Sequence, residues 1–256
     1  MYYFKKLTFD KGEFDNFLDA TYIIHLQGNT TRYNNIIFQL NKFVPTKTVY
    51  ILFNKGFKHK NSLIDNSAKD LSDCYITIFK HNKANTILVL EDDFVWLSNI
   101  KYNKHIDKFC IDNKNENFAF YLGTFSLLFI PRTYYINYSI FNILTHSIIY
   151  SKKLQQQVIN YKIIPDWDIF MNTFITHKYH YYIPLCGQTF TKTVNSKTWI
   201  IYNTPIYDLF FDIINPFFYG DIYPEQLFYF FYLLLPFVLL ICIARITQYN
   251  CSYYYK

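Results

Sequence analysis

The feature that most constrains the fold of this chain is a short apolar run that ends in three consecutive carboxylates. Residues 86–90 are Thr-Ile-Leu-Val-Leu, and Glu91, Asp92 and Asp93 follow directly. A run of β-branched and aliphatic residues of this length is typical of a strand buried on both faces, as in a parallel sheet. The carboxyl end of such a strand is where open α/β sheets usually bind their ligands. The run therefore predicts a ligand site at its end.

Three adjacent acids repel one another unless a positive group neutralises them. Side chains alternate along an extended strand, so Glu91 and Asp93 are expected on one face and Asp92 on the other. A divalent cation that holds a phosphorylated substrate would neutralise this charge. A solvated acidic turn after the strand is the alternative, and the motif alone does not separate the two.

The segments around this strand alternate between strand and helix patterns. Residues 21–26 and 48–53 read as strands, a helix begins at Asn29 or Thr30 and stops before Pro45, and a second helix runs from about residue 68 to 84. This β-α-β-α-β order is typical of a nucleotide-binding α/β half-domain. No Gly-x-Gly-x-x-Gly or Gly-x-x-x-x-Gly-Lys motif occurs, which argues against dinucleotide oxidoreductases and P-loop phosphotransferases.

The remaining patterns complete one α/β domain with a mixed sheet flanked by helices. We expect further helices near residues 100–110 and 151–161, and further strands at 117–122, 125–130, 143–150 and 179–183. No linker is visible before about residue 203. The predicted domain therefore spans residues 1–205, and residues 206–256 form a tail.

Composition limits the partners and the kind of metal site. The net charge is +6, but the basic residues are scattered and form no long run, so no nucleic-acid partner is expected. Five cysteines without a Cys-x-x-Cys pair argue against structural zinc. The abundance of Ile, Asn, Lys, Tyr and Phe indicates an AT-rich genome, such as that of a large DNA virus or a protist.

The tail contains an apolar run of a different kind. The 18 residues from Leu227 to Ala244 include no charge, and Arg245 follows them. Eighteen residues is about the lower limit for a membrane-spanning helix. We therefore predict a single C-terminal span at residues 227–246 and a membrane-associated protein of open orientation. A hydrophobic helix docked on the domain is the alternative.

Several stretches match one known family in the same order along the chain. They are residues 23–32, the sequence Val89–Asp93, the pair Thr145-His146, residues 165–170 and residues 184–196. Together they resemble glycosyltransferase family 25, the group of lipooligosaccharide and procollagen galactosyltransferases. The chain departs from the family pattern at His25, Gln27 and Asp73, where the family usually has Asn, Asp and His.

The resemblance implies a GT-A-like fold and the transfer of a sugar from a nucleotide-sugar. The donor would be a uridine diphosphate sugar, and Mn²⁺ or Mg²⁺ would be the cofactor. The acceptor would be a hydroxyl group on a glycan, a lipid-linked sugar or a protein, and the transfer would invert the sugar. A hexosyltransferase similar to galactosyltransferases is therefore expected.

The residues suggest roles for this chemistry. Hard cations prefer carboxylate oxygens, so Asp93 and Glu91 are the expected metal ligands. Asp92 and Arg32 are candidates for donor binding, although Asp92 could instead orient the motif.

An inverting transfer also needs a base, and Asp168 and Asp166 are the candidates. Asp166 follows Pro165 and could instead be a helix N-cap. Candidates for acceptor or diphosphate contacts are Gln188, His146 and Trp167; the aromatic ring could stack on a sugar or simply lie in the core.

Two other readings stay open. A catalytically inactive relative could bind glycans or scaffold membrane enzymes, and the departures at His25 and Asp73 favour that reading. A metal-dependent nuclease or phosphatase is more remote, because such sites need further carboxylates or histidines from other strands.

Overall fold

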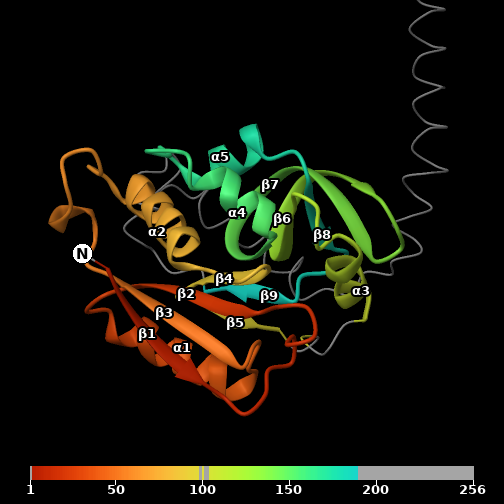
Figure 1. Ribbon diagram of the computed structural model, residues 1–256, viewed down its shortest axis with the longest axis horizontal. Helices are drawn as coiled ribbons and strands as arrows, with labels where there is room; N and C mark the ends of the chain where they lie inside the picture. Colours follow the sequence, from red (N-terminus) through yellow and green to blue (C-terminus); the bar gives the residue numbers. More distant parts are fainter. Residues whose placement is uncertain (1, 98–99, 101–103, 190–256) are drawn as a thin grey trace, which may run out of the picture.

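The computed structural model describes residues 2–97, 100 and 104–189. They form a mixed α/β structure built on a seven-stranded sheet of order β1-β3-β2-β4-β7-β6-β8, with a separate two-stranded sheet, β5-β9 (Figure 1). The strands are β1 Tyr3–Thr8, β2 Ala20–Leu26, β3 Thr48–Asn54, β4 Ile87–Glu91, β5 Phe94–Trp96, β6 Ala119–Pro131, β7 Ile136–Tyr150, β8 Lys178–Tyr181 and β9 Cys186–Gln188. The helices are α1 Thr30–Lys42, α2 Ser67–His81, α3 Lys104–Asp112, α4 Lys152–Val158 and α5 Trp167–Phe174, with a 3₁₀ turn at Phe57–His59.

The first half of the sheet has the predicted β-α-β-α-β order. Strand β2 pairs in parallel with both β3 and β4. Helix α1 begins at the expected cap, where the Asn29 side chain accepts a hydrogen bond from the Arg32 amide. The Asn66 side chain caps α2 in the same way, through the amide of Lys69. Such caps satisfy amides that the helix leaves without partners.

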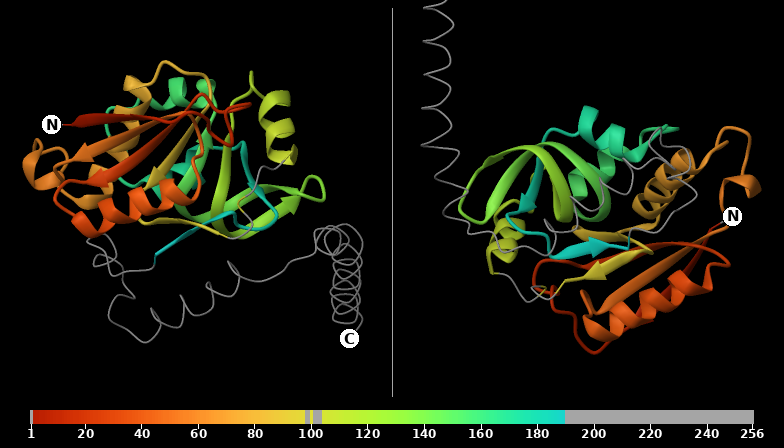
Figure 2. Two further views of the ribbon diagram at one scale, coloured as in Figure 1. Left: turned by 90° about the horizontal axis from the view of Figure 1, so that it is seen from below. Right: turned by 180° about the vertical axis from the view of Figure 1, so that it is seen from behind.

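Strand β4 is buried on both faces, as its apolar run predicts. Leu88 and Leu90 lie in one apolar cluster with residues of α1 and α3, whereas Ile87 and Val89 lie in the other with α2, α4 and α5. Helices therefore cover both sides of the central strand (Figures 1 and 2). Each fully buried aliphatic side chain contributes about 1.5–3 kcal/mol to folding. The end of β4 is consequently held in a fixed position.

The second half of the fold departs from the sequence prediction. The strands expected at 117–122 and 125–130 form one strand, β6, which continues through several irregularities in its pairing with β7. Strand β7 begins at Ile136 rather than near residue 143. Strands β1, β5 and β9 were not predicted. β1 is a half-exposed edge strand with two lysines, and β5 and β9 have three residues each, too few for a periodic pattern.

The predicted tail at 206–256 and its span at 227–246 lie outside the described residues. Within the ranges that are described, no helix has the length and apolar character needed to cross a bilayer.

A close crossing of chains positions β9 beside the end of β4. Strand β9 pairs with β5, so that Gln188 lies opposite Phe94, and the Leu185 amide donates to the Leu122 carbonyl at 2.7 Å. At Gly123, a Cβ atom would lie 1.9 Å from the Cys186 carbonyl oxygen and 2.6 Å from the Nε2 atom of His146. Only glycine fits at this crossing.

We expect Gly123→Ala to destabilise the fold by about 2–3 kcal/mol, because the added methyl group would overlap backbone atoms that cannot move aside. Gly187→Ala is the matched control, since its nearest neighbour is the flexible Leu97 side chain at 3.2 Å. Denaturant unfolding of both variants measures the difference. Equal stability of the two variants would contradict the close crossing.

Candidate active site at the end of strand β4

Asp92 is buried, and the observed partners of its carboxylate come from the end of β2 and the first turn of α1. Its Oδ2 atom lies 2.9 Å from His25 Nδ1 and accepts a hydrogen bond from the Leu26 amide at 3.2 Å. Its Oδ1 atom accepts a hydrogen bond from the Arg32 guanidinium. Both oxygens are therefore engaged within the protein. Through these hydrogen bonds Asp92 holds the end of β4 against β2 and α1. This is the orienting role that the sequence left open.

Arg32, in the first turn of α1, bridges two of the acids. Its Nη1 atom pairs with Asp92 and its Nη2 atom lies 3.2 Å from Asp93 Oδ2. The strand alternation expected for the three acids does not extend to Asp93, because β4 ends at Glu91 and the chain then turns. One turn along the same helix, the side-chain amide Nδ2 of Asn35 donates to the backbone carbonyls of Asp92 and Phe94. Helix α1 thus holds both the side chains and the backbone of this turn.

Asp93 is only 2% exposed, yet one of its oxygens has no partner. The Oδ2 atom accepts a hydrogen bond from Gln188 Nε2 at 2.9 Å and pairs with Arg32. The Oδ1 atom is buried without a hydrogen-bond partner. Burial raises the pKa of Asp93 to about 6, although the charge of Arg32 opposes this shift. Asp93 is therefore a buried acid with an unused acceptor.

Glu91 is half-buried and faces α2 and β7. Its Oε1 atom accepts a hydrogen bond from the Tyr75 hydroxyl at 3.2 Å and lies 3.5 Å from Thr145 Oγ1. Burial raises its pKa well above the ordinary value, and the charges of Asp93 and Asp168 raise it further. We call Glu91, Asp92 and Asp93 the acidic group. Among the described residues, Arg32 is the one Lys or Arg in ion-pair contact with it. The three carboxylates therefore outnumber the basic side chains that contact them.

Helix α5 brings the two candidate bases to different positions. Asp166 is the N-cap of α5, and its Oδ1 atom accepts a hydrogen bond from the Ile169 amide at 2.9 Å. Asp168 is half-buried, and its Oδ1 atom is buried without a hydrogen-bond partner. Burial raises the pKa of Asp168 to about 6, against an opposing effect of the Thr145 hydroxyl. Asp168, rather than Asp166, therefore faces the acidic group.

Two of the predicted contact residues lie in the interior. Trp167 is 1% exposed, its ring stacks on Tyr75 at 4.2 Å, and its Nε1 donates to the Tyr150 hydroxyl. The expectation that Trp167 stacks on a sugar is thus corrected, because protein atoms cover the ring. His146 is also buried, with Nε2 3.2 Å from the Cys186 carbonyl, and burial lowers its pKa to about 4. Its environment is that of a neutral core residue.

Several residues near the acids were missed as site residues. Tyr75 gave no sign of a polar role in the predicted second helix, although its hydroxyl donates to Glu91. Thr145 was noted only as part of a family motif, and Asn35 gave no signal. The position of Tyr75 shows the difficulty: a residue type that suits the core also carries a polar group, and only the neighbouring strand reveals its partner.

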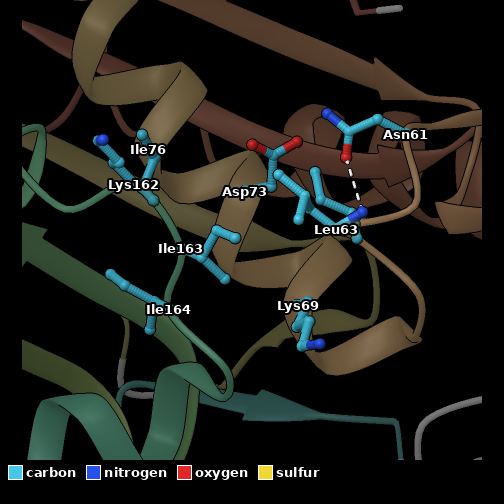
Figure 3. A pocket seen from close by; sticks show the side chains of 9 residues that line it. Asn61, Leu63, Lys69, Asp73, Ile76, Lys162, Ile163 and Ile164 are labelled. Atoms are coloured by element: carbon cyan, nitrogen blue, oxygen red, sulfur yellow. Dashed lines mark hydrogen bonds between the residues drawn. The ribbon is translucent and has the colours of Figure 1, made fainter.

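Asp73, where the family usually has His, lies away from this site. It accepts hydrogen bonds from Tyr2 and, at 3.0 Å, from Lys60. It also lines a cavity of about 110 Å³, together with Ile76 of α2 and residues of two connecting segments (Figure 3). The remaining lining residues are Asn61, Leu63, Ile64, Lys69, Lys162, Ile163 and Ile164.

The fit of a divalent cation to the acids is partial. Across the described ranges, no group of three or more His, Cys, Asp or Glu side chains has an arrangement that could hold a metal ion. Glu91 and Asp93 nevertheless offer two carboxylates, one with an unused oxygen. Mg²⁺ is usually bound by one or two carboxylates while water and substrate phosphates complete its shell. A cation here would therefore need water or a bound phosphate for most of its coordination shell.

Comparisons with known proteins identify no family. No protein-family model matches the sequence, and neither does any curated protein. Among solved structures, A197 from STIV is similar, with 13% identity over 65% of this chain and 82% of that one and a TM-score of 0.41. HddC from Yersinia pseudotuberculosis is similar over 66% of this chain and 74% of that one, with 13% identity and a TM-score of 0.36. Neither score reaches 0.5, so neither structure assigns a function to this chain.

The two acids of α5 should respond oppositely to substitution. The pKa of Asp168 is raised in the folded protein, so its contribution to stability is present at low pH and is lost as the pH rises through about 6. Asp168→Asn should therefore raise the free energy of unfolding by about 1 kcal/mol at pH 7.5 and have little effect at pH 4. Asp166→Ala should instead lower it by about 1 kcal/mol at pH 7.5, because the cap is lost.

Denaturant unfolding at the two pH values measures both effects, and Asp166→Asn is the control because asparagine caps helices as well as aspartate does. A loss of stability for Asp168→Asn at pH 7.5 would show that this carboxylate has a favourable partner.

Proposed function

We propose that this domain is a metal-dependent glycosyltransferase, related to glycosyltransferase family 25 and with a GT-A-like fold. It transfers a hexose, in the manner of a galactosyltransferase, from a uridine diphosphate sugar to a hydroxyl group on a glycan, a lipid-linked sugar or a protein, with inversion. One observation carries the proposal: the buried Oδ1 atom of Asp93 has no partner in the turn that follows β4, a central strand parallel to β2. An acceptor left in this way is costly unless a ligand satisfies it.

Glu91 and Asp93 would hold the Mn²⁺ or Mg²⁺ ion. When bound, such an ion neutralises the charge that develops on the departing diphosphate. Arg32 lies on the same carboxylate through Asp93 Oδ2 and supplies a second positive charge beside the diphosphate. Gln188 fixes the orientation of Asp93 from β9. These contacts support the donor side of the proposal.

Asp168 is the proposed base. Its pKa of about 6 leaves it ionised at neutral pH but close enough to that range to take up a proton. Asp166 is less suited, because its Oδ1 atom is occupied by the helix cap. In this proposal Asp168 accepts the proton of the acceptor hydroxyl as the new glycosidic bond forms. The Thr145 hydroxyl is within reach of both Asp168 and Glu91, and its single proton can be donated to one of these carboxylates at a time.

The proposal also places the protein at a membrane. Residues 227–246, outside the described ranges, would form the single span, so that the domain works on acceptors close to the bilayer.

Ligand-dependent stability tests the donor and metal site. We expect uridine diphosphate with Mn²⁺ to stabilise the native protein by about 2.7 kcal/mol at a ligand concentration 100 times the Kd, and either one alone to stabilise it much less. Asp93→Asn should abolish the joint effect, because the unpartnered carboxylate oxygen is lost. Asp112→Asn is the matched control, since this acid lies on the exposed side of α3 and pairs with Lys108.

Thermal unfolding and hydrolysis of nucleotide-sugars measure these effects. If a folded native protein binds the nucleotide but shows no metal-dependent turnover with any sugar donor, the inactive, glycan-binding reading replaces this proposal.

The pH dependence of transfer tests the base. Turnover should rise as the pH increases through about 6, because Asp168 must lose its proton before it can accept another. Asp168→Asn should lower kcat by about 10²–10⁴-fold and leave nucleotide binding in place. Steady-state kinetics on both proteins make the measurement. An Asp166→Asn variant with the greater loss of kcat would reverse the assignment.

A further inference from the structure

The far end of the β6–β7 hairpin carries an exposed apolar surface that the proposed chemistry does not use. Five of its large apolar side chains are exposed, and the first two are more than half exposed: Leu127, Leu128, Ile130, Ile140 and Phe141. Leu128 and Phe141 are cross-strand partners, so they lie side by side on one face. The hairpin extends away from β2 and β3 in each view (Figures 1 and 2). Clustered exposed apolar side chains mark interaction surfaces.

The hairpin itself carries no acid, although α3, which contacts its turn through the His105–Tyr135 stack, and α5, which contacts β7, both carry acids. No Asp or Glu occurs from residue 117 to residue 165, a stretch that contains both strands and α4. Of the four basic residues in this stretch, Arg132 lies in the hairpin turn, whereas Lys152, Lys153 and Lys162 follow the opposite end of β7. Arg132 lies in the turn between the strands, next to the exposed Tyr134. A partner that combines an apolar interior with an acidic surface would complement both properties.

We propose that the far end of this hairpin inserts into the surface of an anionic lipid bilayer. Exposed Leu, Ile and Phe side chains would enter the boundary between headgroups and acyl chains, where such residues bury apolar area. Tyr134 and Arg132 have the types that occur at this boundary, because each combines an apolar body with a polar end. Arg132, the charged residue of the turn, is attracted to anionic headgroups.

The sequence beyond the described residues gives a second reason to favour a bilayer over a protein partner. The chain itself contains the uncharged run at 227–244, which is long enough to reach across the hydrocarbon of a membrane. A hairpin that also enters the surface would fix how the domain is oriented there. Because the inner parts of β6 and β7 carry Gly123 and Thr145, the same hairpin leads from the lipid surface to the acidic site. This inference stands without the proposed reaction.

Quenching of an introduced tryptophan by brominated lipids tests the proposal. The full chain is reconstituted in vesicles of phosphatidylcholine and phosphatidylglycerol, with bromine on the acyl chains. Emission from Leu128→Trp should shift to shorter wavelength in vesicles and be quenched by the brominated lipid, beyond the signal of the native tryptophans. Phe38→Trp is the matched control, because Phe38 is 64% exposed on α1 and should show neither effect.

Acrylamide accessibility and lipid quenching of the same variant, compared between vesicles and detergent-free buffer, distinguish a bilayer from a protein segment on the hairpin. If Leu128→Trp is shielded from aqueous acrylamide but not quenched by brominated lipid, the chain's own tail, a second copy or another protein covers the hairpin and the proposal fails. It also fails if the residue stays accessible to acrylamide in vesicles. If Leu128→Trp does not fold by circular dichroism, Ile130→Trp on the same strand takes its place, with the same outcomes.

Discussion

The contact of Arg32 with Asp92 and Asp93 is the interaction on which this end of the structure depends. Three consecutive acids leave a buried strand here, and their mutual repulsion would open the turn without a positive group. The guanidinium is suited to the task because it presents several donors in a planar fork and keeps its charge when buried. It joins α1 to the end of β4 and leaves Glu91 and one oxygen of Asp93 uncompensated. The neutralisation is therefore incomplete, which is the condition that a ligand site requires.

The incomplete neutralisation of these acids lowers the free energy of unfolding. Glu91, Asp93 and Asp168 all have raised pKa values, mainly because burial disfavours their charged forms. A site of this kind is stabilised by its ligand and is less stable without it. The two apolar clusters on either side of β4 supply the free energy that holds the acids together. The apolar clusters on both faces of β4 thus stabilise the fold, whereas the buried acids at its end destabilise it.

The sequence predicted the parts of the fold that follow strong local patterns. The parallel strands, the two capped helices between them and the position of the acids at the end of β4 all agree with the structure. The short strands β5 and β9 escaped prediction, because three residues define no period and their pairing joins segments about 90 residues apart.

The site was predictable in its acids and less so in its neighbours. Asp93, Gln188 and Arg32 come together as candidates, whereas Trp167 and His146 lie in the core. An aromatic or imidazole ring suits both settings, so its residue type does not decide between them. The hydrogen bond from Tyr75 to Glu91 depends on how α2 lies across the sheet, and a single sequence does not reveal that packing.

The hydrogen bonds of β9 have a mechanical consequence. Gln188 bonds to the Asp93 side chain, and the amide of Thr189, the last residue described, donates to the Asp93 carbonyl at 2.8 Å. A force applied to the chain beyond this point would reach Asp93 before any other acid. Tension along the chain after Thr189 would therefore disturb Asp93 first and shift its unpartnered oxygen.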